Sequence, residues 1–144
     1  MRKVLIPVDS TNAARTRAAV AEAISINGKE PVAVHLLSVQ LAVSGHVAMF
    51  FGSGELQQLQ LTAGAEDLLP ARAQLDAAGV PYTTIVRVGR SAETIARVAH
   101  ELECDRILMG QAGPGSPGAK VFGSLSQQVR HIVGGTGDCQ VIGS

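Results

Sequence analysis

Short apolar segments alternate with helical segments along this chain, and this alternation restricts the possible folds more than any other feature. Several of the apolar segments are uninterrupted, which is typical of strands that are buried on both faces of a sheet. The pattern predicts strands over residues 4–8, 32–39, 82–88, 106–109 and 140–142. Strands that alternate with helices favour an α/β fold, in which helices cover both faces of a parallel sheet.

Helical periodicity fills the segments between these strands. The predicted helices cover residues 13–26, 56–78, 91–103 and 125–133, and residues 40–55 are expected to form a loop. Gly28 and Gly79 are expected to end the first two helices, because glycine readily adopts the left-handed conformation of a helix terminus. Pro70 is expected to kink or break the second helix, since proline lacks a backbone N–H. In the third helix one face is apolar, formed by Ile95, Val98, Ala99 and Leu102.

Composition and charge narrow the class of protein. The chain has 144 residues, which suits a single domain over residues 1–144, and 46% of them are apolar. Its formal net charge is zero, whereas a nucleic-acid-binding surface usually leaves a basic excess. No apolar run reaches the roughly 18 residues of a membrane span, and no signal peptide is visible. Cys104 and Cys139 fit neither a metal pair nor a disulfide framework. We therefore expect a cytoplasmic protein that binds neither nucleic acid nor a membrane.

A glycine-rich motif lies between the strand predicted at 106–109 and the helix predicted at 125–133. It consists of Gly110, two residues, Gly113, nine residues, Gly123 and Ser124. Small residues allow backbone N–H groups to approach a phosphate, and the N-terminus of the following helix adds partial positive charge. The motif therefore predicts an anion site, most simply for the phosphates of a nucleotide.

Two other glycine motifs overlap this segment. Residues 110–115 have the glycine spacing of a P-loop, but Ser116 and Pro117 follow where the phosphate-binding lysine is required. Residues 113–118 match the dinucleotide fingerprint GxGxxG, but the match contains two prolines and the helix starts several residues later. A P-loop is excluded, and a dinucleotide redox protein has little support.

The chain resembles the universal stress protein family over nearly its whole length. Four segments carry the resemblance in the family's order: Lys-Val-Leu-Ile-Pro-Val-Asp at 3–9, His-Leu-Leu-Ser-Val at 35–39, Val-Gly-Arg-Ser-Ala-Glu-Thr-Ile at 88–95, and Asp-Arg-Ile-Leu-Met-Gly at 105–110. The last of them leads directly into the glycine motif. Four ordered matches are more specific than a single loop.

The resemblance implies a Rossmann-like fold of the adenine-nucleotide α-hydrolase type, with an open five-stranded parallel sheet of order 3-2-1-4-5. It also implies a homodimer formed through the edge of the C-terminal strand, and binding of ATP or AMP, with Mg²⁺ as a possible companion ion. By position, Asp9 would meet the ribose or adenine, the backbone near Leu36 the adenine, and Met109 and Gly110 the ribose. The full set implied for the nucleotide is Pro7, Asp9, Leu36, Met109, Gly110, Gly113, Gly123, Ser124, Leu125 and Ser126.

Some alternatives stay open at this stage. Asp9 also suits the role of N-cap for the helix that begins at Ala13. The nine-residue insert at 114–122 is richer in proline and glycine than the family pattern, and Lys120 is its only basic residue. The predicted function is a nucleotide-dependent stress-response or signalling module with at most slow ATP hydrolysis, since no catalytic constellation and no metal-ligand spacing is visible. The alternative is a dimeric interaction scaffold of the same family that binds no nucleotide.

Overall fold

The computed structural model describes residues 2–8, 13–40, 53–110, 129 and 140–143. Its elements are β1 (Arg2–Pro7), α1 (Ala13–Lys29), β2 (Val32–Gln40), α3 (Ser53–Ala78), β3 (Tyr82–Val88), α4 (Ser91–Glu101), β4 (Arg106–Gly110) and β5 (Gln140–Gly143). Every predicted strand is present, with each end within two residues of its predicted place. The helix predicted over 125–133 lies outside the described residues, except for Val129, which is helical and buried.

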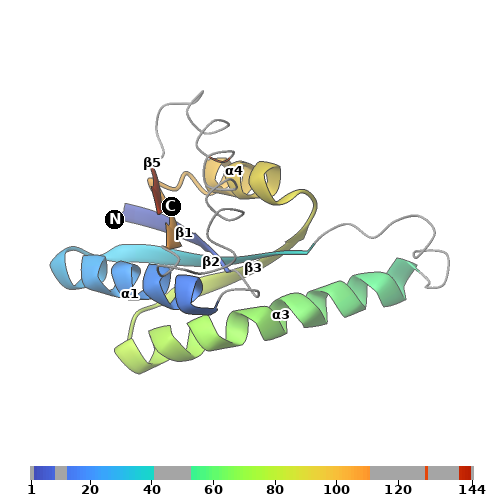
Figure 1. Cartoon of the computed structure of the whole chain (residues 1–144), viewed down its shortest axis with the longest axis horizontal. Coiled ribbons are helices and arrows are strands. Elements are labelled where there is room, and N and C mark those ends of the chain that lie inside the picture. Colours follow the sequence, from blue (N-terminus) through green and yellow to red (C-terminus); the bar gives the residue numbers. More distant parts are fainter. Residues whose placement is uncertain (1, 9–12, 41–52, 111–128, 130–139, 144) are drawn as a thin grey trace.

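The five strands form one parallel sheet with the order β3-β2-β1-β4-β5, which is the order that the family resemblance implied. β1 pairs with β2 over its full length, from Arg2 opposite Val32 to Pro7 opposite Leu37. Because all the strands run the same way, their carboxyl ends meet at one edge of the sheet (Figure 1). The predicted α/β class is therefore confirmed.

Helices cover both faces of the sheet, and Figure 1 shows α1 and α3 on one side and α4 on the other. Residues of alternate parity along each strand divide between two cores, as the pleat of a strand requires. The α1/α3 side buries Val4, Ile6, Val34, Leu36 and Leu108 against Ala19, Val20, Leu68 and Leu75. The α4 side buries Leu5, Leu37, Ile107 and Met109 against Ile95, Val98 and Ala99. The apolar face predicted for the helix at 91–103 is thus confirmed.

The predicted end of the first helix is wrong, because α1 continues through Gly28 to Lys29. Glycine inside a helix costs only about 1 kcal/mol relative to alanine, so it need not end one. Pro31 sets the end instead, since the residue before a proline is disfavoured in helical conformation. The Asn27 side chain then links the last turn to the next strand, because its Oδ1 accepts a hydrogen bond from the Val32 N–H at 3.3 Å.

Pro70 was predicted to kink or break α3. It does not break the helix, because α3 runs as one helix from Ser53 to Ala78. The missing N–H of Pro70 leaves the carbonyl of Glu66 without its helical donor. Both residues are exposed, so water can take the place of that donor. Gly79 does end the helix as predicted: its φ is +70°, and the Val80 N–H donates to the Leu75 carbonyl at 3.1 Å.

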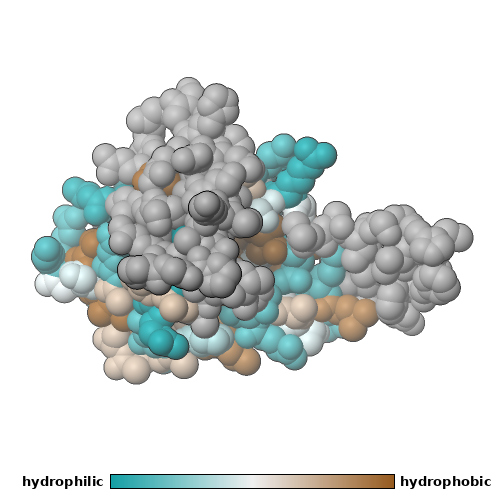
Figure 2. Space-filling model, in the orientation of Figure 1, coloured by the Kyte–Doolittle hydropathy of each residue, from teal (hydrophilic) through white to brown (hydrophobic). Residues whose placement is uncertain are grey.

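The N-terminal part of α3 extends past the end of the sheet (Figure 1). For this reason Leu61 is 44% exposed, although Leu68 and Leu75, which follow it at seven-residue spacing, are buried in the core. Figure 2 shows hydrophobic and hydrophilic residues interspersed over the α1 and α3 side of the molecule. Closer to the sheet, α3 approaches β3 tightly, and Gly64 lies against Val86.

Candidate functional site

The carboxyl ends of the first three strands are held side by side by backbone hydrogen bonds. The Val8 N–H donates to the Leu37 carbonyl at 2.8 Å, just beyond the end of β1. The Gly89 N–H donates to the Gln40 carbonyl at 3.0 Å, just beyond the end of β3. These bonds extend the sheet to its carboxyl edge, where the chain leaves each strand.

The order of the strands reverses between β1 and β4. The chain places β2 and β3 on one side of β1, and then places β4 and β5 on the other. In open parallel sheets of this kind, ligands bind outside the carboxyl ends of the strands at this switch point. The residues that flank it are Pro7 and Val8 at the end of β1 and Met109 and Gly110 at the end of β4. The geometry therefore places the candidate site between β1 and β4.

Three residues of the predicted nucleotide site lie at this point. Pro7 is buried and ends β1, and Gly110 ends β4. Met109 is 1% exposed, and its side chain belongs to the core under α4. The remaining predicted residues at the motif and its surroundings lie outside the described part of the chain: Asp9, Gly113, Gly123, Ser124, Leu125 and Ser126.

Leu36 lies within β2, opposite Ile6 on one side and Thr84 on the other, one residue before the level of Pro7, and its side chain is fully buried. The residues of β2 closer to the edge are Ser38 and Gln40. They extend past the end of β1, whose last residue, Pro7, is opposite Leu37.

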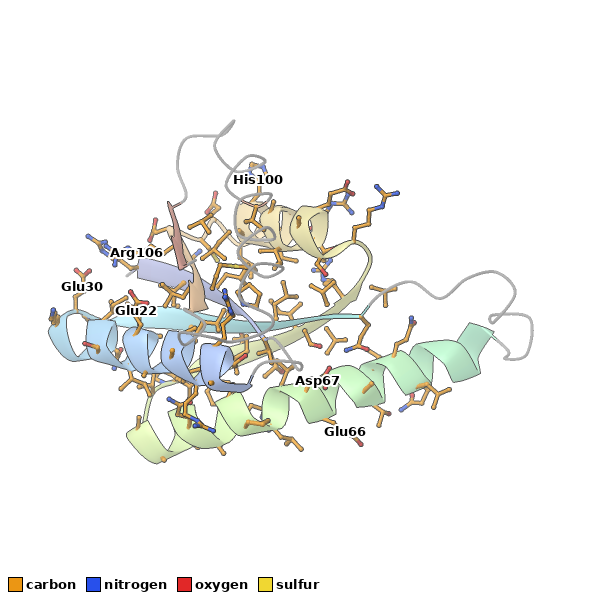
Figure 3. The ribbon with its side chains drawn as sticks, viewed as in Figure 1. Glu22, Glu30, Glu66, Asp67, His100 and Arg106 are labelled. Carbon is orange, nitrogen blue, oxygen red and sulfur yellow. The ribbon has the colours of Figure 1, made fainter. Side chains whose placement is uncertain are left out.

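A polar network that the sequence pattern did not reveal connects β2 with α3 near this edge. The Gln40 Nε2 donates to Ser38 Oγ at 3.0 Å and to Asp67 Oδ2 at 3.1 Å. Figure 3 shows Asp67 on the side of α3 that faces the sheet, whereas Glu66 points away from it. The sequence does carry one signal of this network. Ser38 and Gln40 are polar residues two positions apart at the end of an apolar strand, so they share one face of that strand.

A fully buried arginine lies at the start of α1. Arg15 is 0% exposed, and its neighbour Thr16 is 6% exposed. Arg15 shares the sheet-facing side of α1 with Ala19 and Ala23, which follow it at four-residue intervals. That spacing is visible in the sequence, although Arg15 belongs to none of the sequence motifs.

The opposite half of β2 carries a histidine away from the candidate site. His35 Nδ1 and Thr83 Oγ1 share a hydrogen bond of 2.5 Å. Burial lowers the pKa of His35, and the positive charge of Lys3 lowers it further. Among the residues that the structure describes, no three histidine, cysteine or acidic side chains are grouped closely enough to hold a metal ion. None of the described helices is long and apolar enough to cross a membrane.

Solved structures share this fold along the whole chain. A universal stress protein UspA from Lactobacillus plantarum is 26% identical, with a TM-score of 0.72, 99% of this chain covered and 96% of the other. A family member from Arabidopsis thaliana, solved with AMP bound, is 13% identical, with a TM-score of 0.64 and coverage of 99% and 90%. One from Archaeoglobus fulgidus, in complex with dAMP, is 16% identical, with a TM-score of 0.64 and coverage of 99% and 97%. No curated protein matches significantly in sequence.

The parallel sheet and its switch point define a doubly wound α/β protein of the kind that binds ligands at its carboxyl edge. The model of the universal stress protein family matches residues 1–133. The chain therefore belongs to the universal stress protein family.

Proposed function

We propose that this chain binds an adenine nucleotide at the carboxyl edge of the sheet, between β1 and β4. It then acts as a nucleotide-dependent stress-response or signalling module with at most slow ATP hydrolysis. One observation carries the proposal: Gly110, the first glycine of the motif, is the last residue of β4 and lies at the switch point. The glycine motif therefore starts where sheets of this type bind their ligands.

The described residues suit an adenine nucleotide. Pro7 and Met109 place buried apolar side chains near the carboxyl ends of β1 and β4. Gly110 has no side chain, so a ligand can approach the backbone there. Ser124 and Ser126 carry hydroxyl groups that can donate to phosphate, and Asp9 can accept from ribose hydroxyls. Mg²⁺, when bound with ATP, would neutralise phosphate charge. Two relatives of the same fold were solved with AMP and with dAMP, which supports an adenine nucleotide over other ligands.

The rest of the proposal concerns assembly and context. We infer one universal stress protein domain over residues 1–144, a cytoplasmic location, and a homodimer that forms through β5. Support for the dimer comes from the position of β5 at one edge of the sheet, since an edge strand can pair with a strand of a second copy. Analytical ultracentrifugation tests this point: a monomer at all concentrations up to high micromolar would contradict it.

Calorimetry tests nucleotide binding directly. We expect heat of binding with ATP and with AMP in the presence of Mg²⁺. The variants Gly113→Asp and Ser124→Ala should weaken it, because one adds negative charge near the phosphates and the other removes a donor. Ser25→Ala, which changes an exposed serine late in α1, is the matched control and should bind like the wild type. A folded protein that gives no heat at high micromolar concentration would refute the proposal.

The proline- and glycine-rich insert at 114–122 favours a second candidate, a dimeric interaction scaffold that binds no nucleotide. The absorbance of the purified protein separates the two. The chain has no tryptophan and one tyrosine, so bound adenine would dominate absorbance near 260 nm. Nucleotide released on heating supports the first candidate. A sample without it, which also shows no calorimetric heat, supports the scaffold.

A further inference from the structure

The outer edge of β3 lacks the features that usually protect an edge strand. Among the described strands, β3 is the last on its side of the sheet, and it pairs with β2 over all 7 of its residues. Edge strands are commonly protected by shortness, by proline, by a bulge or by charge. β3 contains neither proline nor lysine, and its one charged residue, Arg87, is held by an ion pair with Glu101 of α4 at 3.1 Å. β3 is therefore well suited to pair with another strand.

The hydrogen bonds of the sheet determine which residues of β3 face outward. The Gly89 N–H donates to the Gln40 carbonyl at 3.0 Å, so the backbone of Gly89 is directed at β2. The direction of the backbone groups alternates along a strand, so the even-numbered residues of β3 direct theirs away from β2. These residues are Tyr82, Thr84, Val86 and Val88.

We propose that β3 pairs with β3 of a second copy of this chain, in antiparallel direction around a twofold axis at Ile85. In this register Thr84 lies opposite Val86 of the second copy, and Tyr82 lies opposite Val88. All four residues face outward, so each pair exchanges both of its backbone hydrogen bonds, as antiparallel pairing requires. The strand brings no like charges together, because Arg87 lies opposite an uncharged threonine of the second copy.

One side of α3 continues this surface with exposed apolar residues. α3 directs Leu68 into the core and Gln74 toward α1, since Gln74 Nε2 donates to the Arg17 carbonyl at 3.2 Å. The side that points away from α1, toward the outer edge of β3, carries apolar residues at four-residue spacing, which places them in one row. This apolar flank consists of Leu61, Ala65 and Leu69, all exposed, with the two leucines at 44% and 53%.

A second copy brings a matching surface to this flank, which an unrelated extended peptide does not. α3 runs antiparallel to β3, because Gly64 lies against Val86, whereas Arg72, two turns later, donates from Nε to the Tyr82 hydroxyl at 3.4 Å. A twofold axis at the middle of β3 therefore sets the apolar flank of one copy against that of the other. Removal of the exposed leucines from water then adds to the hydrogen bonds between the strands, and this favours a second copy as the partner.

This contact is separate from the dimer proposed through β5, because β3 and β5 lie at opposite edges of the sheet. A molecule that uses both edges joins more than two copies. The expected consequence is self-association that depends on β3 and on the apolar flank, whether or not β5 also pairs.

Disulfide cross-linking tests the register. Residues opposite each other in a non-hydrogen-bonded antiparallel pair have Cα atoms about 4.5 Å apart, which a disulfide can span. Ile85→Cys should therefore convert most of the protein into a covalent dimer on oxidation with diamide, and dithiothreitol should reverse it. Ser25→Cys, exposed on α1, is the matched control and should remain uncrosslinked, as should the wild type. If Ile85→Cys forms no more covalent dimer than Ser25→Cys does, the β3 contact is overturned, even where a dimer through β5 persists.

Sedimentation velocity provides a second test that changes only exposed residues and does not depend on whether Ile85→Cys folds. Leu69→Lys, which places a charge on the apolar flank, should weaken self-association by about tenfold. Leu59→Lys is the matched control: Leu59 is 52% exposed on the same helix, and it lies about 120° around the helix from Ala65. It should associate like the wild type. Equal effects of the two variants, or a wild type that stays monomeric up to high micromolar concentration, would overturn the proposal.

Discussion

Replacement of Gly64 by alanine tests how tightly α3 is seated on the sheet. A Cβ at this position would lie 2.5 Å from Cγ1 of Val86, 2.8 Å from its Cγ2 and 3.2 Å from its Cβ. Carbon atoms in good contact are about 3.5–4.0 Å apart, so the overlap is on the order of 1 Å. Valine cannot rotate out of the way, because it is restricted at χ1 and a rotation exchanges one methyl for the other. The helix must therefore move away from β3.

The expected cost follows from two opposing effects. Overpacking of this kind destabilises a protein by about 1–3 kcal/mol, whereas alanine is favoured over glycine within a helix by about 1 kcal/mol. Gly64→Ala should thus lower the free energy of unfolding by up to about 2 kcal/mol. Gly28→Ala is the matched control: Gly28 is also helical, and no described atom lies within 4 Å of a Cβ built there. It should stabilise the protein by about 0.5–1 kcal/mol.

Urea unfolding followed by circular dichroism measures both variants, and Val86→Ala completes a double-mutant cycle. In that background the two methyl groups are gone and only the 3.2 Å approach to the Cβ of residue 86 remains, so Gly64→Ala should be less destabilising than it is in the wild-type protein. If Gly64→Ala stabilises the wild-type protein as much as Gly28→Ala does, the close approach of α3 to β3 is refuted. The result also bears on the site, because Asp67 lies one turn along α3 and holds Gln40 at the end of β2.

Three further predictions concern other contacts. The pKa of His35 is lowered from 6.5, so the unfolded chain binds more protons below that pH and stability should fall as the pH drops through 6.5. His35→Gln should reduce this dependence in urea unfolding between pH 5 and 8, and identical pH slopes would contradict it. Ser38→Ala removes an acceptor of Gln40 and should cost about 1 kcal/mol in thermal unfolding, so an unchanged midpoint would count against the network. Arg87→Ala breaks an ion pair with Glu101 at 3.1 Å between side chains that are 47% and 42% exposed. Because exposed ion pairs contribute little, the free energy of unfolding should fall by less than about 0.5 kcal/mol, and a fall of more than about 1 kcal/mol would contradict this expectation.

The sequence by itself determined the elements of this fold, since the signals for them are local. Uninterrupted apolar runs marked the strands, and the spacing of Ile95, Val98 and Ala99 marked the buried face of α4. Gly79 marked the end of α3, because the turn there needs a positive φ. The place of Gly110 at the end of β4 also followed from the sequence, as the last residue of an apolar run.

Only the tertiary structure decided which residues meet. The same alternation of strands and helices is compatible with several strand orders, so periodicity alone could not place Gly110 beside β1; the family resemblance was needed for that order. Pro70 stays within α3 because the residues around it are exposed to water. The sequence rule that proline disrupts a helix considers only local conformation and does not take solvent exposure into account. The register also decided that Leu36 lies opposite Ile6, while Ser38 and Gln40 extend past the end of β1.

Arg15 shows the limit most clearly, because its charge predicts an exposed residue while its place on the helix predicts a buried one. Whether Arg15 is exposed or buried depends on how α1 packs against β1, which precedes it in the chain, and against β4, which lies far after it. Burial depends on such distant partners, whereas helix and strand periodicity depends on near neighbours. The sequence therefore determined the elements and the start of the glycine motif, and the packing of α1 on the sheet decided that Arg15 is buried.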